Sequence, residues 1–325
     1  MASPGFRRLA LATLVSTFLL VIVGGIVRVS DSGLGCGPAG SGLNGWPFCN
    51  GDVVPGVNLH SIIEYTHRAL AGIVGLMMIS LAVLAWRRYR SNTVLVRATI
   101  ASAVLVVAQG LLGAATVEKD LDEGLVAAHL GLAMALLALL LVVVRASRSQ
   151  KTSDIGPQTS GLRPLALVTS SFVLCTIVAG GYMAGTQNYG RADYQVGDGA
   201  HHACGKEFPS CNGEFMPFGE ARLVDIHLTH RAFMYIATIL VIALVVLSLR
   251  RGVATRLAQL ALGILGAQVL VGALNVWLDE YEALIVLHLG LGTLLWMSVV
   301  GLTLQLYPAR SGAAERTAPP QAVAA

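Results

Sequence analysis

The chain alternates long apolar runs with short polar connections. Eight runs are each long enough for an α-helix to cross the hydrocarbon core of a bilayer, which takes about 20 mainly apolar residues. They cover approximately residues 9–28, 61–86, 94–116, 124–145, 163–184, 227–249, 255–278 and 283–307. The pattern therefore predicts an all-α polytopic membrane protein with eight transmembrane helices.

The composition supports this prediction. Of the 325 residues, 55% are hydrophobic and only 12% are charged, which is too apolar for a soluble domain. The net charge is +4, and no basic cluster is interleaved with aromatic residues. We therefore expect membrane lipid around the protein and no nucleic acid among its partners.

The charges of the connections predict the orientation in the membrane. Basic residues precede the first run and dominate the second, fourth and sixth connections, whereas the third and seventh connections are acidic. Positively charged connections stay on the cytoplasmic side of a membrane. We therefore predict a multi-pass protein of the cell membrane with both termini in the cytoplasm.

Parts of the first half of the chain recur in the second half. Residues 108–114 match residues 267–273 and residues 128–132 match residues 287–291, both at an offset of 159, and Gly24-Gly25 corresponds to Gly180-Gly181. Four runs in each half are an even number, so both halves have the same orientation. This predicts two tandem four-helix bundles related by a parallel internal repeat.

The repeat also predicts the domain boundaries. The two four-helix halves are residues 1–145 and 163–307, joined by a cytoplasmic linker at 146–162 and followed by a disordered tail at 308–325. The linker is rich in polar residues, and the tail contains several prolines. Neither composition favours a packed core.

Ionisable residues stand at the openings of alternate runs. Glu64 and His67 share one helix face at the start of the second run, and His230 opens the sixth. His129 and His288 begin the fourth and eighth runs. All four runs cross in the same direction, so the four histidines lie at one level near the outer face. A single histidine in a helix is usually only a satisfied polar side chain, but four at matching depth favour metal or cofactor ligation.

The ligand set favours haem over zinc. Each half offers two imidazoles on separate helices and no accompanying thiolates or carboxylates inside the bundle, whereas zinc requires three or four protein ligands. Two axial histidines from facing helices suit a haem in a four-helix bundle. We therefore predict that His67 pairs with His129 and His230 with His288.

Further residues fit a haem at this level. Arg28, Arg68 and Arg231 lie near the outer ends of their runs, where a guanidinium pairs with haem propionates or, alternatively, reaches the lipid headgroups. Small residues near the ligands leave room for a macrocycle or serve close helix packing. These are Gly72, Gly75, Gly131, Gly290 and Gly292.

Two cysteine pairs lie in connections predicted to be outside the cell. Cys36 and Cys49 share the first connection, and Cys204 and Cys211 share the fifth. Because that side is oxidising, we predict two disulfide bonds. The alternatives are a redox-active pair and, beside His201 and His202, a metal site in the loop.

Several segments together resemble the haem A synthase family. They are residues 24–36, residues 46–51, Glu64-Tyr65-Thr66-His67-Arg68, His230-Arg231 and His288, and the resemblance covers nearly all eight runs. It implies oxidation of the C8 methyl of haem O to a formyl group by successive hydroxylation, with oxygen from water, to give haem A for cytochrome oxidase. In this chain an insert with Pro38, Gly40, Ser41 and Gly42 separates the first cysteine pair widely.

The resemblance also implies residue roles. His67 and His129 are expected to hold the substrate haem, His230 and His288 a resident haem b, and Glu64 is the expected catalytic carboxylate. Its implied partners are the farnesyltransferase that produces haem O and assembly factors of cytochrome oxidase. The electron acceptor and the oligomeric state, including a homo-oligomer, are left open.

The two halves differ at one position, because His227 stands where the first half has Glu64. A carboxylate beside a bound porphyrin stabilises positive charge or takes a proton from water, and an imidazole does not supply the same charge. We therefore predict that the chemistry takes place in the N-terminal half. Two alternatives are a structural role for Glu64, with His60 or Arg68, and a di-haem b-type membrane electron-transfer cytochrome.

Overall fold

The computed structural model describes residues 2–148, 159–186, 199–278 and 281–307. Within these ranges, eight helices are long and apolar enough to cross a membrane, so the predicted multi-pass α-helical architecture is confirmed. They are α1 (Pro4–Val29), α2 (Leu59–Arg88), α3 (Thr93–Glu118), α4 (Glu123–Ser147), α5 (Leu162–Gly185), α6 (Arg222–Arg250), α7 (Thr255–Trp277) and α8 (Glu282–Gln305). The predicted tail lies outside the described residues, as does most of the predicted linker.

Several helices begin before their apolar runs because polar residues cap them. The Ser3 side chain accepts a hydrogen bond from the backbone N–H of Phe6, so α1 begins about one turn earlier than its apolar run. The Asn58 side chain likewise caps α2, and Asp122 caps α4. Such caps satisfy the N–H groups that a first turn leaves unpaired.

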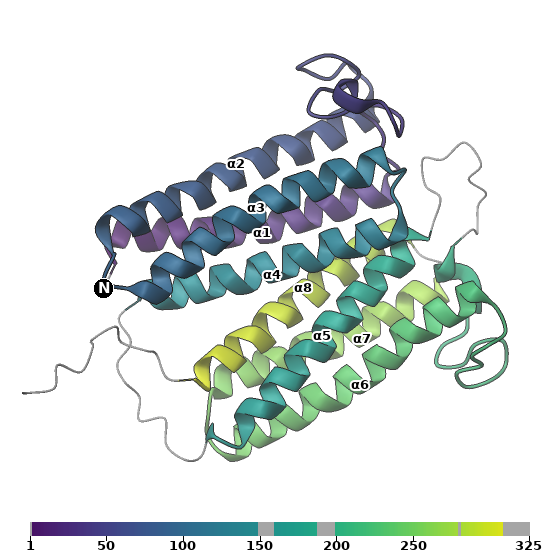
Figure 1. Ribbon diagram of the computed structural model, residues 1–325. Helices are drawn as coiled ribbons and strands as arrows, with labels where there is room; N and C mark the ends of the chain where they lie inside the picture. The colour runs from purple at the N-terminus through teal and green to yellow at the C-terminus, as the bar shows by residue number, and fades with distance from the viewer. Residues whose placement is uncertain (1, 149–158, 187–198, 279–280, 308–325) are drawn as a thin grey trace, which may run out of the picture.

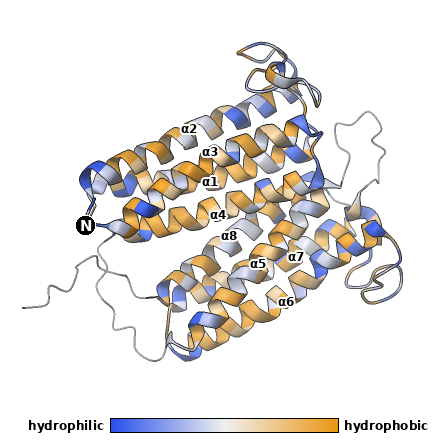
Figure 2. Ribbon diagram, in the orientation of Figure 1, coloured by the Kyte–Doolittle hydropathy of each residue, from blue (hydrophilic) through white to orange (hydrophobic). Residues whose placement is uncertain are grey.

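The helices form two groups, which we call the N-half (α1–α4) and the C-half (α5–α8) (Figure 1). α4 and α8 are the most buried helices and contact each other, with Trp296 Nε1 donating to the carbonyl of Met134 over 2.9 Å. Apolar side chains such as Leu137 and Leu302 are fully buried in the common core. Figure 2 shows that the hydrophobic residues continue over the outer faces of the helices, as a surface in contact with lipid requires.

The first helix of each half packs against the last helix of the other. A methyl group at Gly25 of α1 would lie 2.6 Å from Leu289 of α8, and one at Gly181 of α5 would lie 2.9 Å from Leu130 of α4. A side chain at either position would have to displace the leucine, so the glycines allow the helices to approach closely. The two matching contacts are what a tandem repeat of the halves would produce.

The connections separate into two ends of the bundle (Figure 1). At the end with the N-terminus, Ala2 bonds to Ser147, and Arg145 and Arg163 donate to the carbonyls of Tyr307 and Leu306. The opposite end bears residues 30–58, which we call the N-loop, and residues 199–221, the C-loop. The basic connections gather at the first end, which supports their predicted cytoplasmic location.

Candidate functional site

The four histidines lie near the start of α2, α4, α6 and α8, in two pairs. The imidazoles of His67 and His129 are close enough for their charges to interact, and so are those of His230 and His288. The structure therefore brings together each pair predicted from the sequence.

The imidazole nitrogens fit a ligand role. The Nδ1 atoms of His67, His129 and His288 are buried without a hydrogen-bond partner, whereas Nδ1 of His230 bonds to the carbonyl of Thr176 over 3.0 Å. A buried polar atom that lacks a partner is costly unless a bound group compensates it. Rings with these nitrogens suit axial ligation of haem iron, because haem uses neutral imidazoles on facing helices.

Glutamines occupy equivalent places beside two of these rings. Gln109 of α3 donates to the backbone carbonyl of His129 over 2.9 Å, and Nε2 of Gln268 on α7 lies 3.2 Å from Nε2 of His288. Both side chains connect a histidine-bearing helix to its neighbour. They therefore hold the helix pairs α3–α4 and α7–α8 together at the level of the histidines.

Glu64 is buried, with only 3% of its surface exposed. Its two oxygens have different partners, since Oε1 forms an ion pair with Arg68 and Oε2 accepts the backbone N–H of Cys36 over 2.7 Å. His60 is exposed and approaches Ser32 instead. Glu64 is therefore paired to Arg68 and the N-loop, and it stands one helical turn before His67.

Arg68 also binds the N-loop directly. Its guanidinium donates to the carbonyl of Phe48 over 3.0 Å and to the carbonyl of Gly45. Glu64 and Arg68 thus fasten the loop to the first turns of α2. Arg28 donates to the carbonyl of Ala184 on α5 over 2.7 Å, which links the two halves.

His227 and Arg231 fasten the C-loop to α6 in the same way. The buried His227 donates from Nδ1 to the carbonyl of Ala200 over 2.7 Å. Arg231 donates to the carbonyls of Ser210 and Glu207, each over 2.7 Å. The predicted pairing of Arg28, Arg68 and Arg231 with propionates stays a prediction, since the structure shows these arginines bound to protein carbonyls.

Both predicted disulfide bonds are present. They join Cys36 to Cys49, with an S–S distance of 2.08 Å, and Cys204 to Cys211, with a distance of 2.04 Å. The sulfur of Cys204 is therefore not a free thiolate for a metal. Among the described residues, no group of three or more His, Cys, Asp or Glu side chains has the arrangement of a metal site.

Each second cysteine starts a tight Asn-Gly turn that the sequence analysis did not predict. Cys49 donates to the carbonyl of Asp52 and Cys211 to that of Glu214, each over 2.8 Å. Asn50 and Asn212 have φ angles of 54° and 52°, in the left-handed region that asparagine tolerates. The Asn-Gly dipeptide after each cysteine is the signal that predicts such a turn.

One partly buried histidine of the C-loop is close to the C-half site. His201 lies in a short 3₁₀ turn (Ala200–Cys204), and its Nδ1 is buried without a hydrogen-bond partner. Burial lowers the pKa of His201 well below its ordinary value of 6.5, and the neighbouring His227 and His230 lower it further. In the N-loop, burial raises the pKa of Asp31, while His60 and Arg28 oppose this effect.

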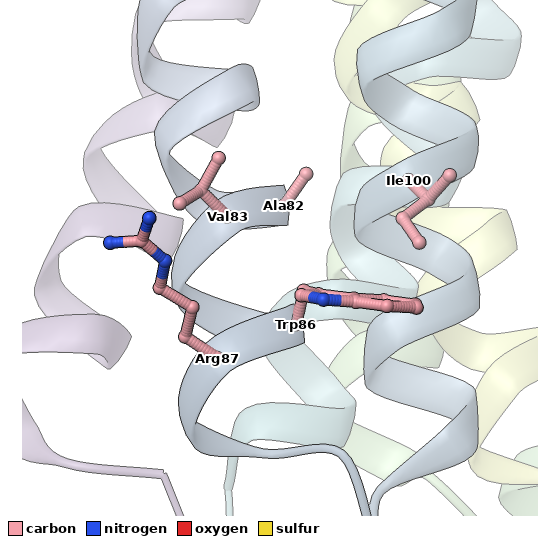
Figure 3. A pocket seen from close by; sticks show the side chains of 5 residues that line it. All are labelled: Ala82, Val83, Trp86, Arg87 and Ile100. Atoms are coloured by element: carbon pink, nitrogen blue, oxygen red, sulfur yellow. The ribbon is translucent and has the colours of Figure 1, made fainter.

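Two surface hollows lie away from the histidines. One, of about 410 Å³, lies between α2 and α3 and is lined by Ala82, Val83, Trp86, Arg87 and Ile100. Figure 3 shows Trp86 reaching from α2 toward Ile100 of α3. The other lies between α5 and α6 and is lined by Ala179, Tyr182, Arg222, Asp225, Ile226 and Thr229. Both are open depressions on the outside of the helices, so neither is the site formed by the paired imidazoles.

Comparison with known families identifies the family to which this chain belongs. Residues 57–300 match the model of the COX15-CtaA family, described as cytochrome oxidase assembly protein. The chain belongs to this family. The matched range contains Glu64 and all four histidines.

Curated relatives extend the match beyond that range. The chain is 31% identical to the haem A synthase of Symbiobacterium thermophilum over 306 residues, which are 89% of this chain and 92% of the relative. It is 30% identical to the haem A synthase of Alkalihalophilus pseudofirmus over 238 residues, 72% of each chain. The haem A synthase of Halalkalibacterium halodurans is 29% identical over 242 residues, 74% of each chain.

The glycines that face the histidines differ from the small residues that the sequence suggested as room for a macrocycle. A methyl group added at Gly72 would have no neighbouring atom within 4 Å, whereas one at Gly131 or Gly290 would meet a side chain of the opposite half. The glycines opposite the imidazoles lie instead on the preceding helices. They are Gly24, Gly113, Gly180 and Gly272.

Proposed function

We propose that this protein is a haem A synthase, which oxidises the C8 methyl of haem O to a formyl group by successive hydroxylation. The observation that carries the proposal is the buried carboxylate of Glu64, one turn before His67, in a chain whose other half has His227 at that place. Curated haem A synthases align with this chain over most of its length. A carboxylate in only one half suits a protein that performs chemistry in one half.

The two imidazole pairs divide between substrate and cofactor in this proposal. His67 and His129 bind haem O, because Glu64 lies beside them, and His230 and His288 hold a resident haem b. When bound, haem b supplies reversible one-electron transfer. The buried, unpartnered Nδ1 atoms of His67 and His129 support the first assignment, and that of His288 supports the second.

Glu64 acts on the proton and the charge of the reacting methyl group. Each hydroxylation takes one oxygen from a water molecule, releases two protons and passes two electrons to an external electron acceptor. Glu64 accepts the proton of the attacking water, and its negative charge stabilises the positive charge that develops on the carbon. Arg68 and the N–H of Cys36 hold the carboxylate in one orientation, because each binds one of its oxygens.

The location follows from the charges at the two ends of the bundle. The basic connections face the cytoplasm in our proposal, so the N-loop, the C-loop and the imidazole pairs lie toward the outer face of the cell membrane. The two disulfide bonds support this orientation, because they persist on an oxidising side.

Replacing Glu64 and identifying the extracted porphyrins tests the function. The purified wild-type protein, produced in cells that make haem O, should yield haem B together with haem O or haem A. The Glu64→Gln variant should keep its haem B and accumulate haem O or its hydroxylated form. His227→Gln is the matched control in the C-half and should still yield haem A.

Two outcomes would contradict the proposal. If the Glu64→Gln variant forms haem A as fast as the wild type, then Glu64 is not catalytic. If the wild-type protein contains only haem B and forms no haem A, then the di-haem electron-transfer cytochrome is the better description.

A further inference from the structure

Each of the four histidines has the edge of its imidazole against one glycine of the preceding helix. A methyl group at Gly24, Gly113, Gly180 or Gly272 would meet the Cε1 atom of the facing ring. The distances would be 3.2 Å to His67, 3.1 Å to His129, 3.0 Å to His230 and 2.9 Å to His288. Contacts this short are rare for real side chains, so a methyl group at any of these positions would have to displace the ring.

The contact is specific to these positions. It joins α1 to α2, α3 to α4, α5 to α6 and α7 to α8, and the same ring atom is nearest in all four cases. Other glycines of the same helices behave differently. Gly110 on α3 and Gly266 on α7 have no neighbouring atom within 4 Å of such a methyl group.

Hydrogen bonds to ring nitrogens orient only two of the four imidazoles, those of His230 and His288. A histidine that binds a metal usually donates its second ring nitrogen to a carbonyl or carboxylate, which fixes the plane of the ring. Nδ1 of His67, His129 and His288 has no such partner, whereas Nδ1 of His230 bonds to the carbonyl of Thr176. Nε2 of His288 lies 3.2 Å from Nε2 of Gln268. For His67 and His129, the backbone surface of the facing glycine is therefore the contact that limits rotation of the ring.

We propose that Gly24, Gly113, Gly180 and Gly272 are positioning residues, which set the orientation of the four imidazoles for axial ligation of haem iron. The inference rests on the proposed function, because it takes the imidazoles as haem ligands. It adds that the preceding helix of each pair contributes to ligation through a glycine. The geometry of a metal ligand tolerates displacements of only a few tenths of an ångström before affinity falls.

The first test compares Gly113→Ala with Gly110→Ala, and Gly272→Ala with Gly266→Ala. In an exposed helix an alanine is more favourable than a glycine, so the two controls should be neutral or slightly stabilised. Gly113→Ala and Gly272→Ala should each lower haem occupancy of the facing pair by about tenfold, the effect typical of losing a residue that orients a ligand. The readouts are the haem-to-protein ratio and the low-spin bis-imidazole signal in electron paramagnetic resonance.

A second test does not need bound haem. Gly113→Ala should lower the melting temperature of the haem-free protein, because the methyl group meets the ring of His129. In a His129→Ala background the ring is gone, and Gly113→Ala should then leave the melting temperature unchanged. A loss that persists without the ring would mean that Gly113 serves helix packing alone, and the proposal would be wrong.

The outcomes separate this inference from the function on which it rests. A wild-type protein without any bis-imidazole signal would contradict the proposed function. A wild-type protein with that signal, unchanged in Gly113→Ala and Gly272→Ala, would overturn the role of the glycines and leave the function intact.

Discussion

The N-half and the C-half each attach their loop to a helix through an arginine and a second side chain four positions earlier. Only the second side chain differs between the halves. In both, an arginine in the third turn of its helix donates to the carbonyl of the residue before the second cysteine, Phe48 for Arg68 and Ser210 for Arg231. Four residues earlier the halves differ, since Glu64 accepts from a backbone N–H while His227 donates to a backbone carbonyl. The side chain at this position holds the loop in both halves, but only Glu64 of the N-half provides a carboxylate.

The largest expected effect is on the rate of haem A formation, when the carboxylate that distinguishes the N-half is removed. Glu64→Gln keeps the size of the side chain but removes the charge, so the rate of haem A formation should fall by about 10²–10⁴-fold, as expected for the loss of a general base. His227→Gln should change the rate by less than about twofold, because the C-half carries no chemistry in the proposed function. Both rates are measured as haem A formed from haem O by purified protein. Equal losses in the two variants would remove the distinction between the halves.

The next largest effect concerns stability. Arg68→Met leaves the buried carboxylate of Glu64 without its ion-pair partner, which should cost about 3–5 kcal/mol. Arg231→Met leaves only backbone carbonyls without a donor, at about 1–3 kcal/mol. Thermal unfolding in detergent compares the two variants. A larger loss of stability for Arg231→Met than for Arg68→Met would show that the buried ion pair of the N-half contributes less to stability than its burial implies.

Removing either disulfide bond should lower stability by a similar amount, so this change distinguishes the halves less than the arginine variants do. The paired cysteines are 13 positions apart in the N-loop and 7 positions apart in the C-loop. Each bond should contribute about 2–3 kcal/mol, and chain entropy makes the N-loop bond stronger by about 0.5 kcal/mol. Serine pairs in place of Cys36 and Cys49, or of Cys204 and Cys211, test this by thermal unfolding. Only the first pair should also slow haem A formation, because the N–H of Cys36 holds Glu64.

The smallest effect is the pH dependence that His201 gives to the C-half. Because its pKa is lowered in the folded protein, the unfolded chain binds more protons as the pH falls below about 6.5. Stability should therefore decrease below that pH, by at most about 1.4 kcal/mol per pH unit. His201→Gln should reduce this acid-side loss, whereas His202→Gln serves as the control. An unchanged pH profile in His201→Gln would exclude His201 as its source.

The sequence was sufficient to predict the features that depend on the length of the apolar runs and on the pairing of cysteines within a loop. The apolar runs predicted all eight helices, since crossing a bilayer requires a long helix whatever its neighbours are. The cysteines predicted both disulfide bonds because each pair lies in one loop. The recurring histidines pointed to pairs whose imidazoles are near each other in the structure, and their role as haem ligands stays a prediction.

The sequence was insufficient where rotation of a helix decides the contact. Gly131 follows His129 closely but packs against Val178 of α5, while Gly113, 16 residues earlier, faces the ring. Closeness along the chain does not reveal which helix face meets which neighbour. The loop-binding role of Arg68 was hidden for the same reason, since it depends on carbonyls that the fold of the N-loop brings near.

Because the first helix of each half packs against the last helix of the other, short chains of contacts connect the two imidazole pairs. His288 is followed by Leu289, which touches Gly25, and the adjacent Gly24 touches His67. The mirror route runs from His129 through Leu130, Gly181 and Gly180 to His230. Each route consists of two peptide links and two van der Waals contacts. Each imidazole pair is therefore connected to the other by four covalent or packing steps, along two separate paths.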